Sequence, residues 1–153
     1  MATPEERLEE LGLAVPDVAK PVAAYVPAVR TGDYVYTAGQ LPLRDGALMA
    51  TGKVGAEVAA ELAAECARQC ALNGLAAVRS IVGELSRVVR VVKVVAFVAS
   101  TPDFTGQPGV ANGASELIGD VFGEAGRHAR SAVGVTVLPL DAPVEVELLV
   151  EVS

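Results

Sequence analysis

The clearest candidate for chemistry is a cluster of cations near the C-terminal end of an acidic chain. Arg127, His128 and Arg130 lie together in the segment GRHARSAVG, directly before a predicted strand. A guanidinium suits anion recognition because its planar N–H groups can hold a carboxylate through two parallel hydrogen bonds. The alternative is that these cations lie at the surface and pair with the many carboxylates of the chain. The cluster therefore predicts either an anion site or a solvated patch.

The strand that would carry Arg130 is predicted over residues 130–138. Because side chains alternate along a strand, Arg130 shares one face with Ala132, Gly134 and Thr136. Small side chains leave space beside the guanidinium. These small side chains predict either the floor of a pocket or a surface for close packing.

Composition and motif content argue against several other classes of function. The 153 residues include 19 acidic and 12 basic side chains, a net charge of −7 that repels nucleic acid. One His is too few for a structural zinc site, and Cys66 and Cys70 are expected to be reduced core residues. The sequence contains neither a phosphate-binding glycine loop nor a GxSxG, HExxH or CxxC motif. It also lacks an apolar run long enough to span a membrane and a signal peptide, so we expect a cytoplasmic protein with no membrane partner. From the charge and the single His we expect neither a nucleic-acid partner nor a metal.

The remaining pattern predicts the elements that position the cluster. Thr3, Pro4 and Glu6 form a helix-start signal, and residues 1–19 are expected to be a peripheral helical extension. At this length one hydrophobic core is the expected solution, so residues 1–153 are interpreted as a single domain. The expected order is β-β-α-β-α-β-β, with strands 25–29, 34–40, 87–98, 130–138 and 144–152, helices 57–79 and 108–122, and a short strand near residue 48.

This order has a consequence for assembly. Two main helices can cover only one face of a four- to five-stranded sheet. Several predicted strands, above all residues 87–98, are apolar on both sides. The second face needs another cover, and a second copy of the chain is the simplest source. We therefore expect an α/β (α+β) protein with a single sheet, assembled as a homo-oligomer with its sheets packed together.

Two motifs resemble those of the RidA (YjgF) family of small trimeric deaminases. GDYVYTAGQLP at 32–42 is similar to the family's GN…SGQ.P element, and RSAVGVTVLPLDAPVEVE at 130–147 to its RS.V.V..LP….VEIE signature. Asn73, Asp103-Phe104 and Asn112 follow in the same order, so the resemblance spans about residues 20–153. It implies a chorismate-mutase-like fold and a homotrimer with sites at the subunit interfaces. It also implies cofactor-independent hydrolysis of reactive enamines and imines such as 2-aminoacrylate to ammonia and a 2-keto acid.

The resemblance also implies roles for two catalytic residues. Arg130 would hold the substrate carboxylate, and Glu145 would orient or activate the attacking water. The residue types suit those tasks, since a fixed guanidinium positions the imine carbon and a carboxylate can polarise water. Glu145 could equally be a solvated strand carboxylate.

Four further positions are candidates for substrate binding. By resemblance, Tyr25 would line the pocket from the neighbouring subunit, Gly39 would bring backbone close to the ligand, and Asn112 would lie near the site. Each has a structural alternative, namely interface packing, strand geometry and a local helix hydrogen bond. His128 has no counterpart in the best-known deaminases and is either an acid–base group or a loop histidine.

The sequence departs from the family pattern at the rim of the expected pocket. The usual Gly-Pro before the tyrosine is Ala23-Ala24, and a common Cys two residues after the arginine is Ala132. Two alternatives to the deaminase therefore stay open. One is a trimer that binds small carboxylates without turnover or acts as a chaperone. The other is an endoribonuclease, which the net charge argues against.

Overall fold

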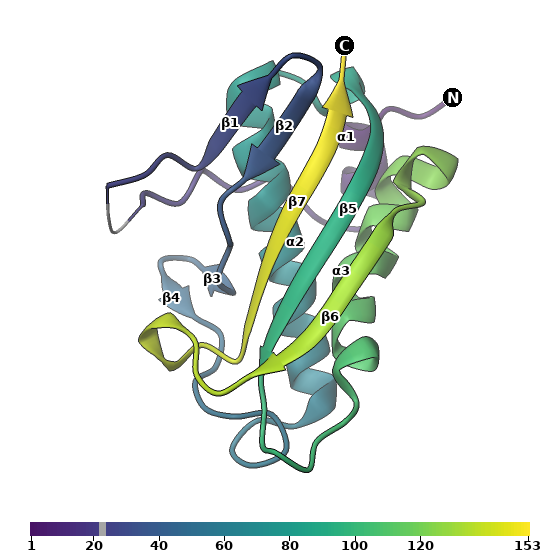
Figure 1. Cartoon of the computed structure of the whole chain (residues 1–153). Coiled ribbons are helices and arrows are strands. Elements are labelled where there is room, and N and C mark those ends of the chain that lie inside the picture. The colour runs from purple at the N-terminus through teal and green to yellow at the C-terminus, as the bar shows by residue number, and fades with distance from the viewer. Residues whose placement is uncertain (22–23) are drawn as a thin grey trace.

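The computed structural model describes residues 1–21 and 24–153 and has two long helices on one face of a five-stranded sheet (Figure 1). The sheet order is β1-β2-β7-β5-β6. Its strands are β1 (Ala28–Thr31), β2 (Tyr34–Thr37), β5 (Val88–Ala99), β6 (Ala129–Val135) and β7 (Val144–Val152). The other elements are α1 (Pro4–Glu10), α2 (Ala60–Val82), α3 (Gln107–Phe122) and the small hairpin of β3 (Leu43–Arg44) and β4 (Ala47–Leu48). The family departure expected at Ala23 lies outside the described residues.

The predicted order of the main strands and helices is confirmed, and the differences lie at the ends of elements. β1 begins at Ala28 instead of residue 25, because Pro27 accepts a hydrogen bond from Ala38 but has no N–H to return one. α2 begins at Ala60 instead of Glu57, whose carboxylate instead accepts the backbone N–H of Lys53. The short strand expected near residue 48 is half of the β3–β4 hairpin.

The core lies between the sheet and the two long helices. Along β7 the valines and Leu148 at even positions are buried, and the odd positions are only half-buried. β5 is interior, pairing with β7 on one side and running parallel to β6 on the other. Cys66 and Cys70 of α2 are free and fully buried, as expected, and burial raises the pKa of the Cys66 thiol to about 11.

A backbone-to-backbone contact fixes α3 against α2. A Cβ atom built on Gly113 would lie 1.9 Å from the carbonyl oxygen of Ala64. Only a residue without a side chain allows the helices to cross this closely. The contact therefore sets how far α3 stands from the rest of the fold, and α3 lies over β6 (Figure 1).

The N-terminal helix is tied to two ends of the fold. Thr3 and Glu6 form the capping box that the sequence predicts, and Leu8 is buried. The Glu5 carboxylate accepts the backbone N–H of Leu85, and Arg7 donates to the carbonyl oxygen of Val121 near the end of α3. α1 thus links the α2–β5 turn to the C-terminal end of α3.

The other face of the sheet has no helix over it among the described residues, and it faces the viewer in Figure 1. Several large apolar side chains are exposed there, between 43% and 52%: Val29, Tyr34, Tyr36 and Val133. Exposed apolar surface of this kind usually marks a contact surface. In residues 1–21 and 24–153, no helix has the length and hydropathy needed to cross a membrane.

The Gly113 contact gives a direct test of the helix packing. Gly113→Ala should lower the free energy of unfolding by about 2–3 kcal/mol, because the added methyl group must push α3 away from α2. Gly119→Ala on the same helix is the matched control, since its Cβ would meet nothing within 4 Å. The control should raise the free energy of unfolding by about 0.5–1 kcal/mol through helix propensity. Denaturant unfolding at one protein concentration measures both, and equal stabilities would contradict the close crossing.

Candidate functional site

Arg130 lies on the helix-covered face of the sheet, in the edge strand β6. Its guanidinium donates three hydrogen bonds, all to α3. Nη1 donates to Asn112 Oδ1 at 2.8 Å and to Ser115 Oγ at 3.2 Å, and Nη2 donates to the carbonyl oxygen of Pro108 at 3.4 Å. Both N–H groups of Nη1 are therefore occupied by acceptors that the helix provides.

The guanidinium keeps one edge available. Within residues 1–21 and 24–153, its Nε–H and one N–H of Nη2 have no hydrogen-bond partner, and no carboxylate forms an ion pair with it. Arg127 differs, since it is exposed and pairs with Glu124 at 3.5 Å. The surface interpretation thus describes Arg127, whereas Arg130 presents the side-on pair of N–H groups that a carboxylate can accept from.

His128 does not extend into open space but contacts the same helix. Its Nδ1 lies 2.7 Å from the carbonyl oxygen of Gly126, and its Nε2 lies 2.9 Å from Ser115 Oγ. Ser115 therefore touches both His128 and Arg130. We call Asn112, Ser115, His128 and Arg130 the guanidinium cluster. Sequence reasoning found three of these residues and missed Ser115, although its spacing of three from Asn112 places both on one side of a helix.

A second group forms around Glu145. Gln40 and Val146 pair through backbone hydrogen bonds of 2.8 and 3.0 Å, which brings the preceding residue, Gly39, beside β7. A Cβ atom on Gly39 would lie 2.5 Å from Oε1 of Glu145. Gly39 and Tyr25 also line one small cavity of about 120 Å³. We call Tyr25, Gly39 and Glu145 the glutamate cluster.

α2 holds the segment that carries Gly39. The buried side chain of Asn73 donates to the carbonyl oxygens of Leu41 and Leu43, at 3.0 and 2.9 Å. Its own side-chain oxygen accepts from Gln69 at 3.1 Å. A buried amide with these partners has a structural role, because leaving it unpaired would be costly.

The Glu145 side chain is half-buried on the uncovered face of the sheet. Burial first, and the neighbouring charge of Glu147 second, raise the pKa of its carboxyl above the ordinary value. A raised pKa means that the carboxyl keeps its proton up to a higher pH than an ordinary glutamate does. Such a carboxyl is better suited to give and take protons than an ordinary surface glutamate.

Strand register places the two clusters on opposite faces of the sheet. Arg130 stands beside Val94, whose side chain is in the core, whereas Glu145 stands beside Phe97 on the other face. Within one chain the sheet separates the two functional groups. The guanidinium cluster and the glutamate cluster therefore cannot act on one small molecule inside the same copy.

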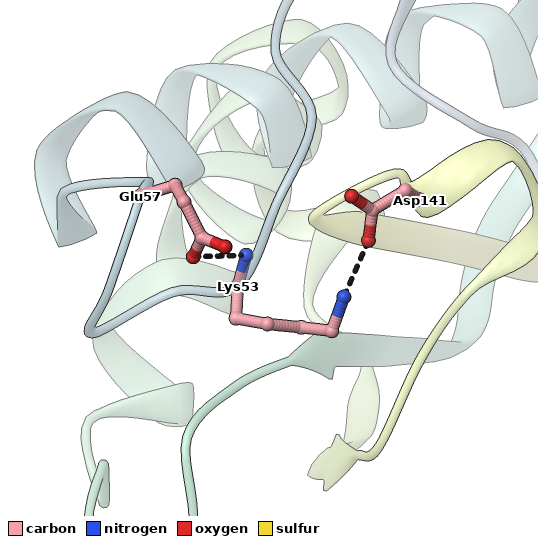
Figure 2. A network of polar contacts seen from close by, with 3 residues as sticks. All are labelled: Lys53, Glu57 and Asp141. Carbon is pink, nitrogen blue, oxygen red and sulfur yellow. Dashed lines mark hydrogen bonds and ion pairs between the residues drawn. The ribbon is translucent and has the colours of Figure 1, made fainter.

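A larger cavity of about 640 Å³ opens at the carboxyl ends of the parallel strands β5 and β6. Gly134, on the Arg130 face of β6, lines it together with Lys53, Ser100, Thr101, Pro102, Phe104, Gln107, Val135 and Thr136. Lys53 is fixed there by an ion pair with Asp141, and its backbone N–H donates to Glu57 (Figure 2). The sequence suggested small residues beside Arg130 but gave no sign of this polar lining.

Comparison with known proteins places this fold in a family. A family model described as "YjgF/chorismate_mutase-like, putative endoribonuclease" matches residues 5–152. Protein TCP17 of Trypanosoma cruzi is 47% identical over 147 residues, covering 95% of this chain and 92% of that protein. The crystal structure of Atu1372 from Agrobacterium tumefaciens, a protein described as having unknown function, is 46% identical with a TM-score of 0.92, covering 98% of this chain and 92% of that one. A Shewanella oneidensis structure named "a putative endoribonuclease" is 33% identical with a TM-score of 0.96, covering 99% and 100%.

These matches and the one main sheet with helices packed on one face define a chorismate-mutase-like protein of mixed α/β class. The chain belongs to the YjgF (RidA) family. The resemblance read from the two sequence motifs is thereby confirmed.

The contact between Gly39 and Glu145 generates a prediction. Gly39→Ala should turn the carboxylate away from its half-buried position, because the added Cβ would occupy the place of Oε1. The pKa of Glu145 should then fall toward its ordinary value, since burial is the main cause that raises it. Carbon NMR titration of the glutamate carboxyls measures this, with Glu145→Gln to assign the signal.

The fold should tolerate the same change, because the displaced atoms are the end of a flexible side chain. We expect a melting temperature within about 4 °C of the original, a shift of less than roughly 1 kcal/mol. Gly119→Ala is the control and should leave the Glu145 titration where it was. An unchanged pKa in Gly39→Ala would show that this glycine does not position the carboxylate.

Proposed function

We propose that the chain is a cofactor-independent enamine/imine deaminase whose site is completed by a neighbouring copy in a homotrimer. The observation that carries this proposal is the state of Arg130. In an acidic chain its guanidinium is held by three acceptors of α3 and pairs with no carboxylate of the described residues. Its remaining N–H groups suit the carboxylate of a small substrate.

The proposed substrate class follows from the group that Arg130 would bind, a carboxylate. A carboxylate bound at the Nε–Nη2 edge fixes the orientation of the atom next to it, because two parallel hydrogen bonds define a plane. In a 2-imino acid that neighbouring atom is the C=N carbon. Holding it in one orientation lowers the entropic part of the barrier to attack by water.

The proposed reaction needs only water and one proton carrier. The water oxygen bonds to the imine carbon, and the proton that it loses goes through the Glu145 carboxylate to the nitrogen. The resulting carbinolamine collapses, the hydroxyl proton follows to the nitrogen, and ammonia leaves. An imino acid and water thus give a 2-keto acid and ammonia, with Glu145 returned to its starting state. The raised pKa of Glu145 supports this role.

A second copy is needed because one chain keeps the two clusters apart. The register puts Arg130 and Glu145 on opposite faces of the sheet. The exposed apolar side chains of the uncovered face support an assembly in which the sheets pack together. In such an assembly the guanidinium cluster of one copy would meet the glutamate cluster of the next. Tyr25, 49% exposed, is then available to line the pocket from the neighbouring subunit.

A site that binds small carboxylates without turnover is the alternative that uses the same arginine. It requires the guanidinium cluster but not Glu145.

An endoribonuclease is the other alternative. That name is part of the descriptions of the family model and of the Shewanella structure, and it is said of those proteins. A net charge of −7 argues against a phosphate backbone as the ligand of this chain.

Turnover measured with a conservative substitution of Arg130 tests the proposal. Pyruvate formation should accelerate when the protein is added to an enzyme that releases 2-aminoacrylate. Arg130→Lys should retain less than about a tenth of that acceleration, because an ammonium cannot provide two parallel N–H groups. Arg127→Ala, which removes an exposed paired cation, is the control and should keep full activity. Pyruvate binding without acceleration would favour the non-catalytic alternative, and neither binding nor acceleration would refute a carboxylate site.

Mixing two inactive variants tests whether each site draws on two copies. Arg130→Ala and Glu145→Gln should each be inactive alone. After unfolding and refolding together at equal amounts, about a quarter of the sites in a random ring should pair an intact arginine with an intact glutamate from the next copy. Activity near that fraction, with size-exclusion chromatography showing a trimer, is the expected result. No recovery in a refolded, assembled mixture would contradict a shared site.

A further inference from the structure

We infer that Ser115 and His128 are positioning residues that hold the Arg130 guanidinium in the orientation its ligand requires. The inference rests on the proposed role of Arg130 as the carboxylate-binding group. It assigns no contact with substrate to either residue. Both act through a chain of hydrogen bonds that starts at the guanidinium and ends at a backbone carbonyl.

The direction of this chain follows from donor and acceptor chemistry. A carbonyl oxygen only accepts, so the 2.7 Å contact with Gly126 requires the proton on Nδ1 of His128. In the neutral ring Nε2 is then an acceptor, and the Ser115 hydroxyl donates to it at 2.9 Å. The Ser115 oxygen in turn accepts from Nη1 of Arg130 at 3.2 Å. Each N–H or O–H in this series of hydrogen bonds therefore has one acceptor.

His128 accepts the hydroxyl proton of Ser115, which would otherwise be donated to a backbone carbonyl of the helix. A serine inside a helix commonly donates its hydroxyl proton to the carbonyl three or four residues earlier. Such a bond would turn the hydroxyl along α3. With the proton directed to Nε2 of His128, the lone pairs of Ser115 are available to Arg130.

The last acceptor in this series of hydrogen bonds, the carbonyl oxygen of Gly126, is fixed by packing. Gly126 is buried, and a Cβ atom on it would lie 2.5 Å from the carbonyl oxygen of Ile118 in α3. The acceptor for His128 is thus held against the same helix that carries Ser115. The imidazole lies between two points of one rigid frame.

The consequence for Arg130 is geometric. Asn112 and Ser115 take both N–H groups of Nη1, and that nitrogen is one corner of the guanidinium. The opposite side of the planar group is the Nε–Nη2 edge. Nη2 donates one N–H to the carbonyl oxygen of Pro108 in α3, so the Nε–H and the other N–H of Nη2 are left for a ligand. Without Ser115 the group would keep only Asn112 and the longer, 3.4 Å bond from Nη2 to Pro108, so the edge would be held less firmly in one direction.

The tautomer of His128 can be measured directly, because it is the single histidine of the chain. In a long-range ¹H–¹⁵N spectrum of the labelled protein, we expect the neutral ring to carry its proton on Nδ1. Adding pyruvate should shift the imidazole signals of the unmodified protein and leave those of Ser115→Ala unchanged. A proton on Nε2, or a ligand response that does not depend on Ser115, would overturn the inference.

Pyruvate affinity gives the second measurement. Ser115→Ala should weaken pyruvate binding by about tenfold, the usual scale for a hydrogen bond to a charged group. Ser115→Thr keeps the hydroxyl and should stay within about threefold on the same scale. Ser86→Ala is the control, since Ser86 bonds only to Glu84 among the described residues and lies in another part of the fold.

Two substitutions of His128 separate its two contacts. His128→Gln places a carbonyl oxygen where Nε2 was, so it can still accept from Ser115 and should bind pyruvate within about threefold of the original. His128→Asn reaches only toward Gly126 and should bind as weakly as Ser115→Ala. Equal binding by these two variants, each shown to be folded by its amide spectrum, would contradict the relay.

The outcomes distinguish this inference from the proposed function. Pyruvate binding that depends on Ser115 without deaminase turnover would refute the deaminase and leave the positioning role intact. Turnover and binding that are indifferent to Ser115 and His128 would do the reverse. Absence of both pyruvate binding and turnover in the unmodified protein would refute both.

Discussion

The alternation of side chains along three neighbouring strands is the constraint on which the rest of this structure depends. β5 runs parallel to β6 and antiparallel to β7, and its register assigns every residue of both neighbours to a face. A shift of one position in the β5–β7 pairing would turn Glu145 toward the helices and bury its charge, and the same shift in the β5–β6 pairing would turn Arg130 away from its acceptors on α3. The cost of such burial is large, so the core that fixes the register also fixes the placement of the functional groups.

Helix α3 connects packing with function. Its apolar side is part of the core, its Gly113 touches the backbone of α2, and its exposed edge presents the acceptors for Arg130. Displacing the helix would therefore move the guanidinium together with its partners. A long, flexible side chain in an edge strand gains one orientation because a rigid neighbour provides several acceptors at once.

Much of this arrangement could be predicted from the sequence. The strict alternation in β7 gave its bounds, 144–152, and strand periodicity placed Arg130 on a face with Ala132 and Gly134. Contacts between distant segments could not be predicted, such as the pair of Lys53 and Asp141, 88 residues apart. Ser115 was missed for another reason, since a serine three residues after an asparagine is common on helix surfaces. Its role depends on the loop that returns His128 to the same helix.

The separation of the two clusters has a consequence for how such proteins diversify. The elements that hold the arginine are α3 and β6, while those that hold the glutamate are β7 and the segment around Gly39. A substitution in one group leaves the supports of the other untouched. The proposed anion recognition and the proposed proton transfer thus rest on separate supports within a single small gene product, so a substitution can retune or remove one and leave the other in place.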